Sequence, residues 1–154
     1  MQSHSLELFA DYLQFYLQDE GASGDLSDAW SLIAIQRMFA VSMGVVGIGT
    51  ARNMCVPVTL EFLDSAPSAD FMEFDHVVEG SLAITKGPLV VAGCMDYLPD
   101  AARFDLAPGE YRVRLSSSGL CTLSEDGLDG QDHYRLQLWQ ASPTEPTVLK
   151  QRAV

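Results

Sequence analysis

The sequence predicts a mainly β fold, an antiparallel β-sandwich or jelly-roll-like barrel of about eight or nine strands with one short helix near the N-terminus. Three observations support this fold class. Apolar and polar residues alternate with a period of two in several short segments. Turn signals such as Ala107-Pro108-Gly109 separate these segments. Helical spacing is clear in only one segment, whereas parallel βαβ units would need many helices.

The N-terminal part of the chain is predicted to contain an extended segment, a loop and the helix. Residues 6–17 would also fit a helical stripe, but their many aromatic side chains favour a strand. Whether residues 10–17 join a sheet or pack as a helix stays open. Small residues and glycines predict a loop over residues 19–25. Ser27 is a suitable N-cap, and the apolar residues after it have helical spacing, which predicts a helix over residues 27–38.

The rest of the chain is predicted to consist mainly of strands. Residues 54–62 alternate between apolar and more polar or smaller side chains, and residues 111–115 and 134–138 alternate in the same way. Each of these strands therefore has one face suited to the core and one suited to water. More continuous apolar runs predict more deeply buried strands over residues 45–50, 76–84 and 89–94.

Length and hydropathy predict a single domain over residues 1–154. The chain has 154 residues, of which 47% are hydrophobic, and this is enough for one sizeable core. Its apolar runs are much shorter than the roughly 18 residues that a membrane-spanning helix needs. The first residues lack the basic start and apolar middle of a secretory signal. We therefore expect a cytoplasmic protein that makes no membrane contact.

The cysteines give no indication of a disulfide framework or a metal site. Cys55, Cys94 and Cys121 are odd in number and widely spaced. A zinc site that used them with His76 or His133 would lack the closely spaced ligand pairs typical of such sites. We expect buried, unreactive thiols and no bound cofactor.

Charge is the strongest signal in the composition. The chain has 21 acidic and 9 basic residues, which gives a formal net charge of −12. Nucleic acid is a poor partner for such a surface, because binding to it depends on lysine and arginine contacts with phosphates. Two interpretations remain for the acidity: it keeps the protein soluble, or it attracts a basic protein.

The richest acidic segment covers residues 125–133. Two glycines and four carboxylates lie in it before His133, and three interpretations apply. The carboxylates could bind calcium, although their spacing is not that of an EF-hand. Asp-Gly steps also favour plain hairpin turns with a solvated tip. The third interpretation is contact with another protein. The carboxylates are those of Glu125, Asp126, Asp129 and Asp132.

Catalytic motifs are weak in this sequence. Asp75-His76 and Asp132-His133 each place a carboxylate next to an imidazole, but neighbouring residues of a strand point to opposite faces. The serine cluster at residues 116–118 lacks the G-x-S-x-G pattern of a nucleophile elbow. The glycines of residues 44–49 lack the order of a phosphate-binding loop. The sequence therefore favours a protein that is not an enzyme.

Four segments carry a family resemblance. They are V-P-V-T-L-E-F (residues 56–62), F-D-H-V-V-E-G-S-L-A-I (74–84), F-D-L-A-P-G-E-Y-R-V-R-L (104–115) and D-H-Y-R-L-Q-L-W (132–139). This succession resembles a family of small, uncharacterised bacterial proteins. Its strand order and its P-G-x-Y turn are also distantly similar to those of the competence-nuclease inhibitors, small acidic proteins that bind and restrain a DNA-entry nuclease. The resemblance implies an acidic binding protein, and it assigns no binding residue.

Two classes of function are consistent with these observations, and we favour the first. A non-enzymatic binding module, of inhibitor or immunity type, would present an acidic patch to a basic protein partner. Its binding residues would be Glu125, Asp126, Asp129, Asp132 and His133, with Trp139 as a nearby aromatic. Alternatively, a small-ligand-binding protein or enzyme would have a pocket inside the sandwich. Candidate lining residues for that pocket are Tyr97, Arg112, His133 and Tyr134. The oligomeric state stays open.

Overall fold

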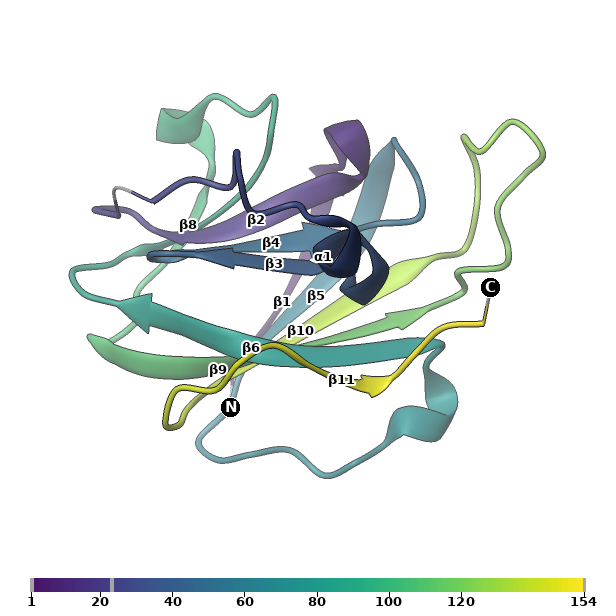
Figure 1. Ribbon diagram of the computed structural model, residues 1–154. Coiled ribbons are helices and arrows are strands. Elements are labelled where there is room, and N and C mark those ends of the chain that lie inside the picture. The colour runs from purple at the N-terminus through teal and green to yellow at the C-terminus, as the bar shows by residue number, and fades with distance from the viewer. Residues whose placement is uncertain (1, 23, 154) are drawn as a thin grey trace.

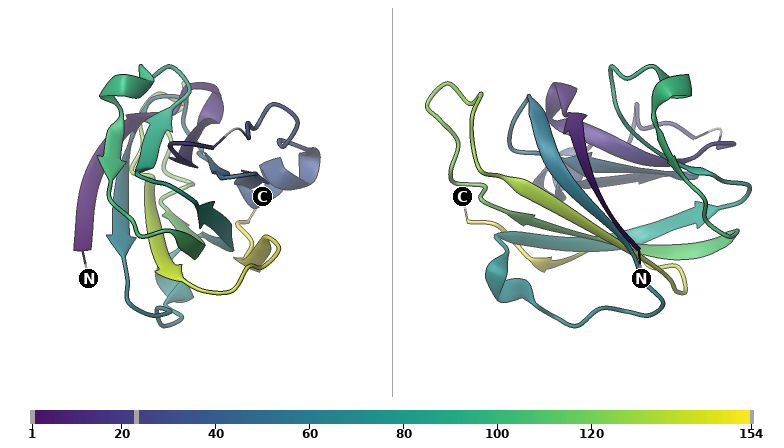
Figure 2. Two further views of the ribbon diagram at one scale, coloured as in Figure 1. Left: turned by 90° about the vertical axis from the view of Figure 1, so that its left-hand side faces the viewer. Right: turned by 180° about the vertical axis from the view of Figure 1, so that it is seen from behind.

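The computed structural model describes residues 2–22 and 24–153, which form two β-sheets packed face to face (Figure 1, Figure 2). The larger sheet has the strand order β1-β5-β10-β9-β6-β11, and the smaller has the order β3-β4-β2-β7-β8. In neither sheet of the described residues do the two end strands pair with each other, so neither sheet closes into a barrel. The prediction of a sandwich is confirmed, and the barrel alternative is wrong. The strands of the larger sheet are β1 (Gln2–Phe9), β5 (Cys55–Phe62), β10 (His133–Gln140), β9 (Gly109–Ser118), β6 (His76–Ile84) and β11 (Thr147–Lys150), and those of the smaller are β3 (Phe39–Ser42), β4 (Val45–Gly49), β2 (Gln14–Asp19), β7 (Leu89–Gly93) and β8 (Ala102–Phe104).

One strand pair departs from the antiparallel prediction. Strand β10 runs parallel to β5, with Tyr134 opposite Val58 and Leu138 opposite Phe62, although it is antiparallel to its other neighbour β9. Because β5 and β10 are parallel, both strands begin at the same end of the sheet. The connection before β5 and the acidic segment before β10 are therefore neighbours in space.

The extended prediction for residues 6–17 is confirmed for most of the segment. It forms two strands, which belong to different sheets: β1 pairs with β5, and β2 lies between β4 and β7. A short 3₁₀ turn, η1 (Asp11–Leu13), connects them. Tyr12 and Leu13 have φ angles of 60° and 61° there, in the left-handed region that non-glycine residues rarely adopt.

The predicted helix is shorter than expected. Helix α1 (Leu32–Arg37) has Ser31 as its N-cap, whose hydroxyl oxygen accepts a hydrogen bond from Ala34 N at 3.2 Å. The expected cap, Ser27, instead donates through its hydroxyl and its backbone N–H to Asp25, in a local turn that competes with helix formation. No helix in the described ranges is long and apolar enough to cross a membrane.

The core lies between the two sheets. Its largest fully buried side chains include Phe15 and Phe39 from the smaller sheet and Leu60 and Leu136 from the larger. The alternating and continuous apolar runs of the sequence correspond to strands β4, β5, β6, β7, β9 and β10. Two further 3₁₀ turns, η2 (Phe71–Glu73) and η3 (Leu98–Asp100), lie in the connections at the rim.

Candidate protein-binding surface

The acidic segment forms a loop between β9 and β10 that extends beyond the sheets (Figure 1, Figure 2). We call residues 119–132 the acidic loop. Glu125, Asp126 and Asp129 are exposed, as a binding surface requires. Asp132, however, has an exposed fraction of 0%. Its prediction as a surface binding residue is therefore wrong.

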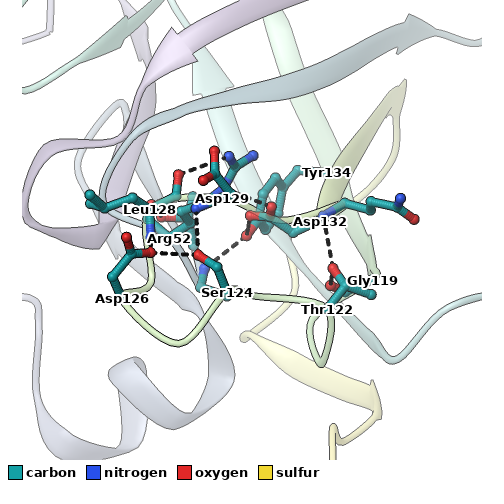
Figure 3. A network of polar contacts seen from close by, with 12 residues as sticks. Arg52, Gly119, Thr122, Ser124, Asp126, Leu128, Asp129, Asp132 and Tyr134 are labelled. Atoms are coloured by element: carbon teal, nitrogen blue, oxygen red, sulfur yellow. Dashed lines mark hydrogen bonds and ion pairs between the residues drawn. The ribbon is translucent and has the colours of Figure 1, made fainter.

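Hydrogen bonds within the acidic loop fix the position of its tip (Figure 3). The Ser124 hydroxyl donates to Asp126 Oδ1 at 2.6 Å, and Leu128 N donates to the same oxygen at 3.0 Å. Ser124 also exchanges two bonds with Asp129: Ser124 N donates to Asp129 O at 2.7 Å, and Asp129 N donates to Ser124 Oγ at 3.0 Å. The bonds from Ser124 and Leu128 lower the pKa of the Asp126 carboxyl, so this group is negatively charged at neutral pH.

A buried polar network anchors the acidic loop to the connection that precedes β5 (Figure 3). Arg52 Nε forms an ion pair with Asp132 Oδ1 at 2.9 Å, and Arg52 Nη1 donates to Leu128 O at 3.3 Å. The Tyr134 hydroxyl donates to Asp132 Oδ2 at 2.7 Å and accepts from Ala51 N at 2.8 Å. Burial raises the pKa of the Tyr134 phenol far above its usual range, so it stays protonated and can donate. Asp132 thus holds the loop in place.

His133 begins β10 next to the acidic loop but contributes a neutral group. Its Nε2 atom lies 2.8 Å from Thr59 Oγ1 on the neighbouring strand β5. Burial, followed by the positive charge of Arg135, lowers the pKa of the His133 imidazole. The half-buried ring therefore adds little charge to the acidic surface.

Trp139 does not belong to the surface around the acidic loop, and its prediction as a nearby aromatic is wrong. It lies six residues after His133, which corresponds to about 20 Å along an extended strand. Its exposed fraction is 4%, and its ring centre is 5.4 Å from the guanidinium carbon of Arg114. Phe71 covers the same guanidinium at the same distance. Trp139 is part of the packing on the outer face of the larger sheet.

The four residues of the alternative pocket do not converge on one cavity. Tyr134 is fully buried in the network around Asp132, and Tyr97 is 70% exposed in the connection after β7. Arg112 pairs with Glu79 at 3.3 Å. With His133 bound to Thr59, these side chains serve separate structural roles. The prediction of a pocket lined by them inside the sandwich is therefore wrong.

The structure does contain a hollow, on the side of the molecule that carries α1. Its cavity volume is about 660 Å³, and five separate segments form its wall: η1, the segment around α1, the end of β4, the start of the acidic loop and residues 151–153. We call it the α1 hollow. Its lining residues include Tyr12, Leu13, Trp30, Ile35, Cys121 and Arg152.

Apolar side chains at the α1 hollow are unusually exposed. Tyr12, Leu13 and Ile35 have exposed fractions of 72%, 47% and 57%. Helix α1 buries the small Ala34 and exposes its larger aliphatic residues, which is the reverse of a core-facing helix. Sequence patterns did not predict this site, because the aromatic residues of the N-terminal segment favoured a strand. One available signal was the run of large aliphatic residues Leu32, Ile33 and Ile35, which cannot all face the core from one short helix.

The C-terminal wall of the α1 hollow is fixed by His76, which is fully buried. Its Nδ1 atom accepts a hydrogen bond from Arg152 N at 3.2 Å. The other nitrogen, Nε2, lies 2.6 Å from Arg37 O at the end of α1 and donates to it. Burial lowers the pKa of the His76 imidazole, so the ring is neutral and both contacts are satisfied.

The buried, neutral His76 predicts that the free energy of unfolding decreases as the pH is lowered. The imidazole of the unfolded chain takes up a proton below about pH 6.5, whereas the folded ring resists protonation because its pKa is lowered. Between about pH 7 and about pH 5.5, His76 should therefore reduce the free energy of unfolding by up to about 1 kcal/mol. Urea unfolding at both pH values would measure this, with His76→Asn as the control that should show a smaller loss. Equal losses in both proteins would contradict the prediction.

The cysteines are a further correction. Cys55, Cys94 and Cys121 are free thiols and all three are exposed, so the expectation of buried thiols is wrong. Cys55, for example, is the outward-facing first residue of β5, next to the fully buried Val56. Within residues 2–22 and 24–153, no group of three or more His, Cys, Asp or Glu side chains is placed to hold a metal ion.

Comparison with known proteins identifies the fold. No protein-family model and no curated protein matches the chain. A solved structure of ComJ from Bacillus subtilis, an inhibitor of the DNA-degrading activity of NucA, matches with a TM-score of 0.70 and 18% identity, covering 91% of this chain and 98% of ComJ. The product of crocagin biosynthetic gene J matches with a TM-score of 0.60 and 16% identity, covering 92% and 100% of the two chains. The predicted resemblance to a competence-nuclease inhibitor is thus confirmed at the level of the fold.

Proposed function

We propose that this protein is a non-enzymatic binding protein of inhibitor type, which binds a basic protein partner through its acidic loop. One observation carries this proposal: the exposed carboxylates of Glu125, Asp126 and Asp129 stand on a loop that is already fixed by hydrogen bonds and by Arg52. A loop ordered before binding loses less conformational entropy when it meets its partner.

The charge distribution supports a basic partner. The acidic loop contains four carboxylates and no lysine or arginine, in a chain whose formal net charge is −12. Arg52, which lies against the loop, is paired with the buried Asp132. The tip therefore keeps its negative charge, which accelerates association with a positively charged surface.

The fold likeness to ComJ supports a nuclease as the partner. Nucleases contact DNA phosphates, and such contacts are made mainly by lysine and arginine. A rigid group of carboxylates would bind to the same cationic surface and exclude DNA from it. In this proposal, the acidic loop inhibits by occupying the site of the DNA backbone.

Neutralising the tip of the acidic loop is expected to weaken partner binding about tenfold at low salt. The double variant Glu125→Gln with Asp129→Asn is suitable, because these side chains make no hydrogen bond within the described structure, whereas Asp126 holds the loop. The immobilised protein would be exposed to a cell extract of its source at about 50 mM and about 500 mM salt. The retained basic protein would then be purified, and its affinity and its DNA-degrading activity measured with each variant.

The matched control is Asp64→Asn with Glu145→Gln, which removes the same number of charges. Asp64 follows β5 and Glu145 follows β10, so both lie at the strand ends opposite the acidic loop. This control should bind like the unaltered protein. If no basic protein is retained at low salt, or if the two double variants behave alike, the proposed role of the acidic loop is wrong.

A further inference from the structure

The α1 hollow adjoins the acidic loop, and its chemistry differs from that of the loop. We propose that the hollow is a docking site for one apolar side chain of the basic partner, carried on a segment in which lysine or arginine flanks that side chain. This inference rests on the proposed function and adds what the partner must present besides charge.

The backbone at η1 supports a binding role for the hollow. Tyr12 and Leu13 both adopt left-handed φ angles, which are unfavourable for side chains other than glycine, asparagine or aspartate. Their conformation exposes an aromatic and an aliphatic group beside Ile35. Strain of this kind occurs preferentially at binding and active sites. The hollow is also within the usual size range of ligand pockets, about 300–1,000 Å³.

The wall of the hollow is preorganised by Trp30. Its indole N–H donates to Gln14 Oε1 on β2 at 2.8 Å, which fixes the orientation of the ring. Trp30 also packs over Gly47 of β4, where an added Cβ would come within 2.7 Å of the ring atom Cζ2. Rigid tryptophan and tyrosine side chains are typical of the residues that contribute most to protein–protein binding.

Charge complementarity specifies the occupant. Acidic residues adjoin two segments of the lining in the chain: Asp11 precedes Tyr12, and Cys121 belongs to the acidic loop, which continues to Glu125. Among the described lining residues, Arg152 is the one with a charged side chain. Its positive charge would repel a lysine or arginine placed within the hollow. An apolar group therefore suits the hollow, and the basic residues that flank it on the partner would meet the segments that carry Asp11 and the acidic loop.

A pair of synthetic peptides tests this inference. In the first, one phenylalanine stands between two pairs of lysines; in the second, glycine replaces the phenylalanine. Binding would be followed by NMR on the isotope-labelled protein, with the indole N–H signal of Trp30 as the reporter. We expect the phenylalanine peptide to shift this signal and to bind about tenfold more tightly than the glycine peptide, because burial of one aromatic side chain contributes on the order of this factor.

Two variants of α1 provide a matched comparison. Ile35→Ser should abolish the advantage of the phenylalanine peptide, whereas Ile33→Ser should retain it. Ile33 is exposed to a similar extent on the same helix but does not line the hollow. Equal binding of the two peptides, or equal effects of the two variants, would overturn the inference. A protein that is dimeric by light scattering and becomes monomeric with Ile35→Ser would also overturn it, by assigning the hollow to a second copy of the chain.

The experiment separates this inference from the proposed function. Glu125→Gln with Asp129→Asn should weaken both peptides alike, because both carry the same lysines. If that variant weakens partner binding while Ile35→Ser does not, the acidic loop is the binding site and the hollow is not part of it. If neither changes partner binding, both proposals are wrong.

Discussion

Replacement of Arg52 by methionine is expected to lower the free energy of unfolding by about 3–5 kcal/mol. Asp132, its ion-pair partner, has a side-chain exposure of 0%, and the Arg52 side chain is 11% exposed. Removing the guanidinium leaves a buried carboxylate that, within residues 2–22 and 24–153, keeps the Tyr134 hydroxyl as its single hydrogen-bond donor. Methionine keeps most of the apolar stem, so the loss reports chiefly on the charge. Urea unfolding with linear extrapolation would measure it.

An exposed ion pair provides the control for this prediction. Arg103 pairs with Glu20, and their side chains are 29% and 45% exposed. Arg103→Met should therefore cost no more than about 1 kcal/mol. The double variant Arg52→Met with Asp132→Asn should recover part of the loss, because it no longer contains an unpaired buried charge. Similar losses for Arg52→Met and Arg103→Met would mean that the Arg52 network does not anchor the acidic loop.

Replacement of Phe39 by alanine is expected to lower the free energy of unfolding by about 3–5 kcal/mol. Phe39 is fully buried on β3, and its ring covers Gly80 of β6 in the opposite sheet. The ring thus fills space between the sheets, and its removal would leave a cavity there. Urea unfolding of the variant at neutral pH would measure the loss.

The contact with Gly80 makes this prediction more specific. A Cβ atom at position 80 would collide with the Phe39 ring, so Gly80→Ala alone should destabilise the protein by about 1–3 kcal/mol. In the Phe39→Ala background, the added methyl group enters vacated space. The double variant should therefore lose less than the sum of the single losses. Additive losses would show that the two residues do not share this contact.

The sequence predicted the sheet elements well, because the signals for them are local. The two-residue alternation in residues 54–62 and 134–138 depends only on the pleat of each strand, and both segments are strands of the larger sheet. The prediction for α1 was less accurate at its start. Ser27 and Ser31 are both acceptable N-caps, and the choice between them depended on the turn that Ser27 makes with Asp25.

The candidate site was only partly predictable. The sequence located Glu125, Asp126 and Asp129 on one loop, because acidic residues with intervening glycines favour a solvated turn. It did not separate Asp132 from them. The burial of Asp132 depends on Arg52, which belongs to a distant part of the chain and comes close only because β5 and β10 run parallel.

Periodicity, composition and turn chemistry are properties of neighbouring residues, and they were enough to predict a mainly β fold, sandwich or barrel, the acidity of the chain and the position of the acidic loop. The choice of a sandwich over a barrel, the exposure of individual carboxylates, the burial of Trp139 and the apolar hollow next to the loop became visible in the three-dimensional structure. The wall of that hollow comes from five separate segments. Contacts between such segments arise from strand pairing and sheet packing, which no local pattern encodes.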